Sequence, residues 1–213
     1  MVLEPGKSEG TSGLQTVFDA VSTLLTTVAG AESFAGPMAR QADRLPDPRG
    51  DGAAAAFAQG VDWTATATPA TRAAVTAFLG VRFDWVRPYE GDPRAGRGFA
   101  EGAAYCMLSG AAAAGAAADF SGGFFIVAAD VDYHDHRHGP TELYLPLSGR
   151  ARYWTATGGW RQAAPGTAMV HAPWEWHAMQ TRDEPVLIFW AWRNEDRVDE
   201  ALELRESFGG RPA

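Results

Sequence analysis

The spacing of apolar residues changes before the middle of the chain and divides it into two parts. In the first part, apolar residues recur every three or four positions, which is typical of amphipathic helices. This spacing predicts helices over residues 14–28, 32–44 and 70–79. Residues 1–97 are therefore predicted to form a mainly helical segment, and residues 98–213 a unit of different structure.

Capping and breaking residues set the expected limits of these helices. Ser12 or Thr11 can cap the first helix, while Pro69 opens and Gly80 closes the third. Residues 49–56 combine glycines with a run of alanines, and we interpret them as a loop or linker.

The second part contains short runs rich in aromatic and β-branched residues, separated by Gly, Pro and Asp. The clearest runs cover residues 124–128, 142–147, 151–156, 167–171 and 186–192. Closely spaced short strands of this kind predict an antiparallel sandwich or barrel. The expected fold class is mainly β, with the helical segment packed on the barrel. An alanine-rich stretch at 111–118 is expected to be a loop or a short surface helix.

The charge and the cysteine content of the chain exclude some classes of function. The chain has 213 residues and a formal net charge of −8, which opposes nucleic-acid binding. Its single cysteine, Cys106, excludes an internal disulfide framework and is expected to be a buried, inert thiol. The N-terminus lacks a signal-peptide pattern, and no apolar run is long enough to span a membrane. We therefore expect a cytoplasmic protein.

Candidate chemistry is concentrated in the histidines, all five of which lie between residues 134 and 177. His136 and His138 alternate along a predicted strand and so share one face. A Gly-Pro turn then presents Glu142, and His177 follows later in the chain. Two imidazoles, a carboxylate and a third imidazole suit one divalent transition metal ion.

Two histidines are expected to stand outside this ligand set. His134 lies two residues before His136, so the two side chains should share one face of the strand. His134 should then lie at the barrel mouth, where it could orient a ligand or the substrate. His171 lies in an apolar strand and is expected to be a satisfied core histidine.

The same residues resemble the two conserved motifs of cupins, which are small metal-binding β-barrels with a jelly-roll-like fold. The first motif is matched by His136, His138, Glu142 and Gly149, and the second, more loosely, by Gly166, Pro173 and His177. In the first motif Asp130 stands where a glycine is usual.

The strings at 133–149 and 164–179 further resemble bacterial cupin-type dimethylsulfoniopropionate (DMSP) lyases, and this likeness extends over residues 99–193. The resemblance implies cleavage of DMSP to dimethyl sulfide and acrylate with a metal and a tyrosine base. It implies one divalent ion per chain, for which Zn is the first expectation and Fe(II) or Mn(II) are also suitable, and no organic cofactor.

Tyr144 is the candidate base. It shares a strand face with Glu142, so a metal at Glu142 would lie beside the phenol and lower its pKa from about 10. The family's base position agrees with this assignment. Tyr133 matches a second family tyrosine that assists the substrate or the base. Tyr133 lies three residues before His136, so on a regular strand their side chains point to opposite faces. Tyr133 therefore reaches the pocket only through a bulge or a twist at the strand end.

The implied substrate is a small zwitterion with a sulfonium group, which an aromatic cage would hold by cation–π attraction. Trp190 and Trp192 share one face of the last predicted strand, and Tyr105 is a further candidate for the cage. The aromatic-rich strands and additional helices are compatible with a homodimer.

Two other functions fit three histidines and a glutamate. An iron-dependent cupin dioxygenase would need open metal positions for oxygen but no tyrosine base. A non-catalytic small-molecule-binding cupin would keep the ligands and form no product. The pair formed by Glu142 and Tyr144 favours the lyase.

Overall fold

The structure of the protein is a computed structural model that describes residues 9–41, 53–109, 119–194 and 201–212. The predicted loop or surface helix at 111–118 lies outside these residues.

The described helices occupy the first half of the chain. They are α1 (Glu9–Thr27), α2 (Glu32–Ala39), α3 (Ala53–Gly60), α4 (Arg72–Leu79), the 3-10 turns η1 (Pro88–Gly91) and η2 (Pro93–Ala95), and the single turn α5 (Phe99–Gly102). None of them combines the length and the apolar character needed to cross a bilayer.

The predicted helices exist, but several of their boundaries were wrong. Helix α1 starts at Glu9, so Ser12 and Thr11 lie inside it rather than at its cap. Helix α4 starts at Arg72 instead of residue 70, and it ends at Leu79 with Gly80 as its C-cap, as predicted. The alanine run expected to be a loop forms α3, because alanine has the highest helix propensity and this helix buries its small side chains.

Two five-stranded antiparallel sheets form the second part of the chain. One has the order β1-β2-β9-β4-β7 and the other the order β10-β3-β8-β5-β6. Their strands are β1 (Ala103–Ser109), β2 (Phe120–Val127), β3 (Asp132–Arg137), β4 (Thr141–Ser148), β5 (Ala151–Thr155), β6 (Gly159–Ala163), β7 (Met169–His171), β8 (His177–Gln180), β9 (Val186–Arg193) and β10 (Glu203–Leu204). The predicted fold class, a cupin-type barrel preceded by helices, is confirmed.

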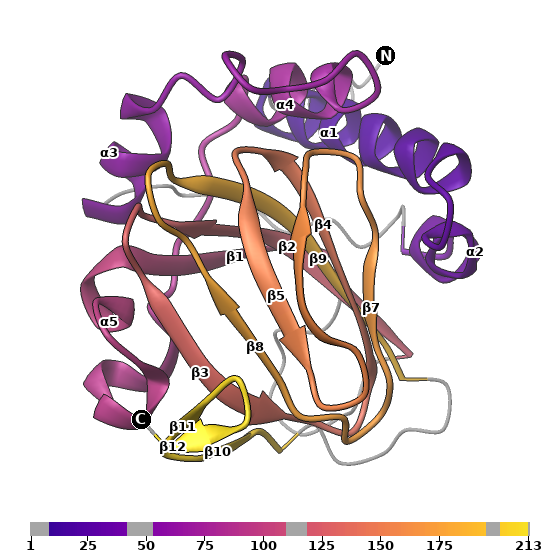
Figure 1. Ribbon diagram of the computed structural model, residues 1–213. Helices are drawn as coiled ribbons and strands as arrows, with labels where there is room; N and C mark the ends of the chain where they lie inside the picture. The colour runs from indigo at the N-terminus through magenta and orange to yellow at the C-terminus, as the bar shows by residue number, and fades with distance from the viewer. Residues whose placement is uncertain (1–8, 42–52, 110–118, 195–200, 213) are drawn as a thin grey trace, which may run out of the picture.

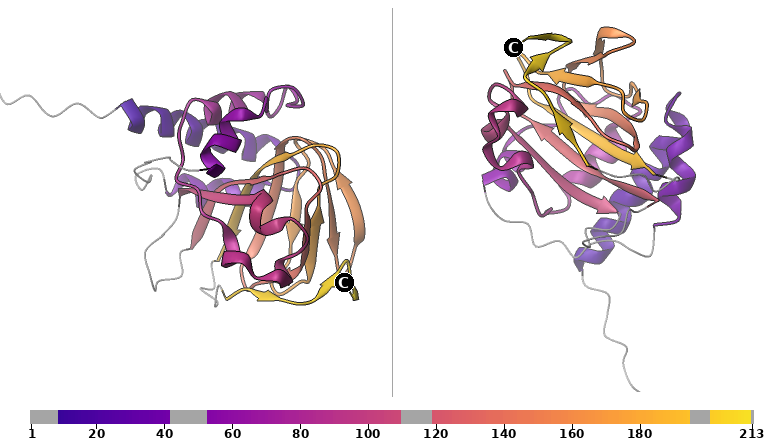
Figure 2. Two further views of the ribbon diagram at one scale, coloured as in Figure 1. Left: turned by 90° about the vertical axis from the view of Figure 1, so that its left-hand side faces the viewer. Right: turned by 90° about the horizontal axis from the view of Figure 1, so that it is seen from below.

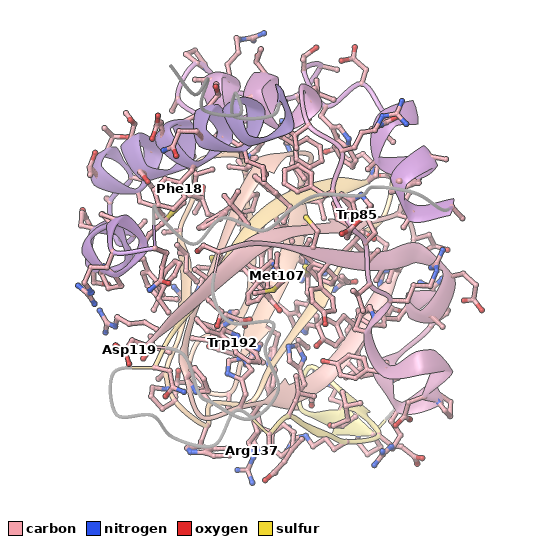
Figure 3. The ribbon with its side chains drawn as sticks, turned by 180° about the vertical axis from the view of Figure 1, so that it is seen from behind. Phe18, Trp85, Met107, Asp119, Arg137 and Trp192 are labelled. Atoms are coloured by element: carbon pink, nitrogen blue, oxygen red, sulfur yellow. The ribbon has the colours of Figure 1, made fainter. Side chains whose placement is uncertain are left out.

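The first sheet is covered on both faces over most of its area, so its central strands β2, β4 and β9 are buried along nearly their whole length. Leu143, Leu145 and Phe189 face the helices and join a core that includes Phe18 of α1 (Figure 3). Neighbouring residues such as Tyr144 face the barrel interior instead. Figures 1 and 2 show the helices lying outside the barrel, which leaves its interior to the second core.

A bulge in β3 determines which of its side chains enter the barrel. Tyr133 pairs with Met179 of β8, and His136 pairs with His177. Three steps along β3 therefore match two steps along β8, which places one extra residue in β3. Tyr133 and His136 consequently face the same side of the sheet, and their rings stack with centroids 3.8 Å apart.

The end of the described chain is held against the outer side of β3 by a buried carboxylate. Asp135 is fully buried and accepts hydrogen bonds from the guanidinium of Arg205, the hydroxyl of Ser207 and the backbone N–H groups of Gly209 and Gly210. Strand β10 pairs with β3, and the hairpin β11 (Ser207–Phe208) with β12 (Arg211–Pro212) lies beside it (Figure 1).

We expect Asp135→Ala to lower the free energy of unfolding by about 2–4 kcal/mol, because it leaves several buried donors without an acceptor. Urea denaturation would measure the change. Asp130→Asn is the control: the Asp130 carboxylate is 67% exposed and pairs with Arg97 at the surface, so the loss of its charge should change little. Asparagine is used because Asp130 has a φ of +58°, a left-handed conformation that asparagine tolerates and alanine does not. Equal stability of the two variants would contradict the anchoring role of Asp135.

Candidate active site

A cavity of about 510 Å³ opens inside the barrel. This volume lies within the roughly 300–1,000 Å³ range of small-molecule sites. Its walls come from the segment before β1, from β1, β2, β3, β4 and β9, and from the residue preceding β10. The lining residues are Val86, Pro88, Tyr89, Phe99, Tyr105, Met107, Ser121, Phe125, Tyr133, His136, His138, Glu142, Tyr144, Trp190, Trp192 and Leu202. Figure 3 shows Met107 and Trp192 near the middle of the barrel.

Three of the four predicted metal ligands form a compact donor set. His136, Glu142 and His177 each offer one ligand atom, and these atoms lie within 4.8 Å of one another. His138 is not part of this set, but its Nε2 atom lies 3.2 Å from Oε2 of Glu142. All four side chains are buried.

The backbone fixes how these imidazoles point. The Nδ1–H groups of His136, His138 and His177 donate to the carbonyls of His134, Pro140 and Glu175 at 2.9, 3.1 and 2.8 Å. A carbonyl only accepts, so each neutral ring carries its proton on Nδ1 and keeps a bare Nε2. The three Nε2 atoms are buried and have no hydrogen-bond partner among the described residues.

Such an arrangement fits a metal ion. Histidine ligands in metal sites usually donate their other N–H to a carbonyl or carboxylate, which orients the ring. A buried carboxylate among bare imidazole nitrogens is otherwise an uncompensated negative charge, which is costly in a protein interior. The donor set of nitrogen and oxygen atoms suits Zn, Fe(II) or Mn(II).

Glu142 is itself held in place from two sides. The indole N–H of Trp192 donates to Oε1 at 2.8 Å, and Nδ1 of His171 donates to Oε2 at 3.1 Å. Burial would raise the pKa of the Glu142 carboxyl, but His138, His171 and His177 hold that pKa well below its ordinary value. The carboxylate is therefore ionised and ready to bind a cation.

The imidazoles of His136 and His171 are neutral at physiological pH. Burial, with a contribution from His177, lowers the pKa of His136 well below its ordinary value and that of His171 to about 4. Neutral imidazole is the form that binds metals. His171, expected to be only a core histidine, is buried as predicted, but its partner is the carboxylate of the site.

Tyr144 lies beside this cluster. Its ring meets that of His171 edge to face at 5.2 Å and lies 6.4 Å from the ring of His177. Burial and the neighbouring Glu142 carboxylate raise the pKa of the Tyr144 phenol well above its ordinary value. In this environment the phenol is protonated unless a cation offsets the carboxylate.

The bulge in β3 brings Tyr133 into the cavity and turns His134 away from it. His134 does not line the cavity, and its ring lies 5.5 Å from that of Phe208. The expectation that His134 shares a face with His136 was wrong, because the extra residue reverses the alternation between them. The substrate-binding assignment of His134 therefore finds no support in its position.

The three aromatic residues expected to form a cage lie together. The rings of Trp190 and Trp192 are 5.8 Å apart, and the ring of Tyr105 meets that of Trp190 edge to face at 6.1 Å. All three line the cavity. The sequence did not predict the hydrogen bond that ties Trp192 to Glu142.

Sequence reasoning missed two polar residues of the cavity wall, Ser121 and Tyr89. Tyr89 lies in η1, before the barrel begins, and its hydroxyl is hydrogen-bonded to that of Tyr133. No spacing rule connects two residues so far apart in the chain, so the sequence offered no signal for this pair. Met107 and Phe125 also line the cavity, and neither was among the predicted site residues.

The fold and the buried cluster define a cupin-type barrel with a candidate metal centre inside it. A family model for dimethylsulfoniopropionate lyase matches residues 43–188, which is more than half of the chain. The chain belongs to the DMSP lyase family and is a carbon–sulfur lyase. This membership decides in favour of the lyase over the oxygen-activating and non-catalytic alternatives.

Solved structures agree with this fold. The DMSP lyase DddQ from Ruegeria pomeroyi DSS-3 is 22% identical, with 92% of this chain and 98% of that chain covered and a TM-score of 0.73. A chain described with the DMSP lyases RdDddP and RnDddQII is 19% identical, with 92% and 100% covered and a TM-score of 0.74. No curated protein matches the chain significantly.

Proposed function

We propose that the protein cleaves DMSP by a metal-dependent β-elimination in which Tyr144 removes the α-proton. The observation that carries this proposal is that Tyr144, Glu142 and His136 line one cavity. The ionised Glu142 and the bare Nε2 atoms of His136 and His177 form the adjoining donor set. This arrangement supports the proposal, because a phenol that could accept a carbon-bound proton lies beside residues that could hold a cation.

His136, His138, Glu142 and His177 would hold the metal ion, for which Zn is our first expectation. A bound dication would stabilise negative charge on the substrate carboxylate and lower the pKa of the adjacent phenol. Trp192 and His171 keep Glu142 in position through their hydrogen bonds.

The reaction of the substrate balances without any other reagent. Tyr144 takes the α-proton, and the electron pair of the broken C–H bond forms the double bond of acrylate. The C–S bond breaks, and its electrons neutralise the sulfonium, so that dimethyl sulfide leaves uncharged. Tyr144 then returns the proton to solvent.

The positive end of the substrate fits the aromatic wall. Trp190, Trp192 and Tyr105 can face the sulfonium methyl groups, and cation–π attraction contributes about 2 kcal/mol when such a group is desolvated. Met107, on the same strand as Tyr105, adds further apolar surface to this side of the cavity.

Purified protein incubated with DMSP is expected to release dimethyl sulfide, measured in the headspace by gas chromatography. Pretreatment with a chelator should remove most of this activity, and adding back Zn²⁺, Fe²⁺ or Mn²⁺ should restore it and rank the metals. Undiminished release by protein shown to be metal-free would overturn the metal dependence. No release with any of the three metals would overturn the proposed function itself.

A further inference from the structure

Tyr89 reaches the cavity from outside the barrel, and its backbone is held in an unusual conformation. Its φ is +63°, in the left-handed region that bulky residues rarely occupy. Such a conformation persists only where the surroundings enforce it, and it is often associated with function. Here its carbonyl accepts a hydrogen bond of 2.8 Å from the N–H of Asp92.

The chain on either side of Tyr89 is fixed to the barrel. Val86 exchanges backbone hydrogen bonds of 2.8 and 2.9 Å with Tyr105 of β1. The guanidinium of Arg87 donates to the carbonyls of Ala100 and Glu101 at 2.8 and 2.6 Å. The hydroxyl of Tyr89 is therefore placed in the cavity wall by contacts that bind its segment to β1 and α5.

The hydrogen bond between Tyr89 and Tyr133 leaves one hydrogen unused. Each phenol has a single O–H, and in a pair only one of the two hydrogens lies between the oxygens. Among the described residues, neither hydroxyl has another hydrogen-bond partner. A phenol ordinarily titrates near pH ~10, so each of the two carries its hydrogen at neutral pH. The pair thus keeps one free O–H donor.

Tyr133 is the member of the pair closer to the candidate metal centre. Its ring stacks on that of His136 at 3.8 Å, whereas the ring of Tyr89 lies beyond it, 6.0 Å from Tyr133 and 5.7 Å from Phe99. A free donor on Tyr133 would face the same part of the cavity as Glu142. The anionic end of a zwitterionic sulfonium substrate is its carboxylate, which is the acceptor such a donor requires.

We propose that Tyr89 is a positioning residue: its hydroxyl donates to Tyr133, so that the hydrogen of Tyr133 is directed at the substrate carboxylate. This inference rests on the proposed function for the identity of the substrate. The tyrosine pair would bind the substrate carboxylate, and the aromatic wall of Trp190, Trp192 and Tyr105 would bind the sulfonium. The two ends of the substrate would thus be recognised separately.

Calorimetric binding to the Zn²⁺-loaded protein separates these two ends without depending on turnover. Acrylate carries the carboxylate alone, and trimethylsulfonium carries the cation alone. Tyr133→Phe should weaken acrylate binding by about 10- to 100-fold, as expected for loss of a hydrogen bond to a charged acceptor. Tyr89→Phe should weaken acrylate binding by about 5- to 10-fold, and the double variant should match Tyr133→Phe. Binding of trimethylsulfonium should be unchanged in all three variants.

Tyr153→Phe is the matched control. Its hydroxyl is buried in the same core without a partner among the described residues, and it does not line the cavity. It should bind acrylate like the wild type, and thermal unfolding and metal content should show that every variant is folded and loaded.

Several results would contradict the role of Tyr89. They are wild-type affinity for acrylate in Tyr89→Phe, multiplicative effects in the double variant, or no acrylate binding by the wild-type protein. If the wild type releases dimethyl sulfide but Tyr89→Phe binds acrylate normally, the positioning role fails and the proposed function stands. If no dimethyl sulfide forms but the acrylate series behaves as expected, the carboxylate site stands and the proposed reaction fails.

Discussion

Tyr144→Phe should lower kcat for DMSP cleavage by about 10²- to 10⁴-fold, the range typical of a lost general base. The substitution removes only the phenolic oxygen, so the ring keeps its contacts with His171 and Phe125 and the barrel keeps its packing. KM should change much less than kcat, because the oxygen acts on the proton rather than on substrate binding. Headspace measurement of dimethyl sulfide gives the rates, and elemental analysis gives the metal content.

Tyr153→Phe is again the suitable comparison, because the Tyr153 ring lies 6.0 Å from that of Tyr144 and its hydroxyl lacks a partner among the described residues. It should keep near-normal kcat. A Tyr144→Phe variant that retains metal and activity would refute the base assignment. A variant that loses its metal would instead make Tyr144 part of the metal site.

His177→Ala should lose most of its bound metal and, with it, the elimination. His177 offers its Nε2 atom to the donor set, and its ring contacts those of His136, His138 and His171. Loss of an outer-shell partner typically costs 10- to 100-fold in metal affinity, and loss of a ligand should cost more than about 100-fold. Metal content after dialysis against a weak chelator, and competition with a chromogenic chelator, would measure the effect.

The chain supplies its own control for this experiment. His134→Ala removes an imidazole two residues from His136, yet this side chain lies outside the cavity beside Phe208. It should retain the metal and the activity. Full retention of metal by His177→Ala, or an equal loss in both variants, would break the proposed ligand set.

Much of the fold could be predicted because local patterns determined it. Helical spacing in the first part and short aromatic runs in the second identified the helices and most strands, and the cupin motifs tied Glu142 and His177 to one barrel. Gly149, a motif glycine, shows why such patterns hold: its φ is +74°, and a Cβ there would lie 2.0 Å from the carbonyl oxygen of Pro185. Only glycine fits this turn.

What could not be predicted depends on register and on contacts between distant segments. A regular strand places Tyr133 and His136 on opposite faces, and only the pairing with β8 reveals the extra residue that brings them together. The hydrogen bond of His171 to Glu142 likewise follows from the pairing of β7 with β4. Tyr89 contacts Tyr133 only through tertiary packing, so no periodic pattern in the sequence predicts this contact.

The interval between Tyr133 and His136 is as much a part of the active site as the residues themselves. When related chains are compared, an alignment that opens or closes a gap inside this interval would equate residues that face opposite sides of the sheet. Such an alignment could still superpose His136, His138, Glu142 and His177 without error. Conservation of length between the tyrosine and the first ligand histidine is therefore a criterion, independent of residue identity, for finding barrels that share this cavity.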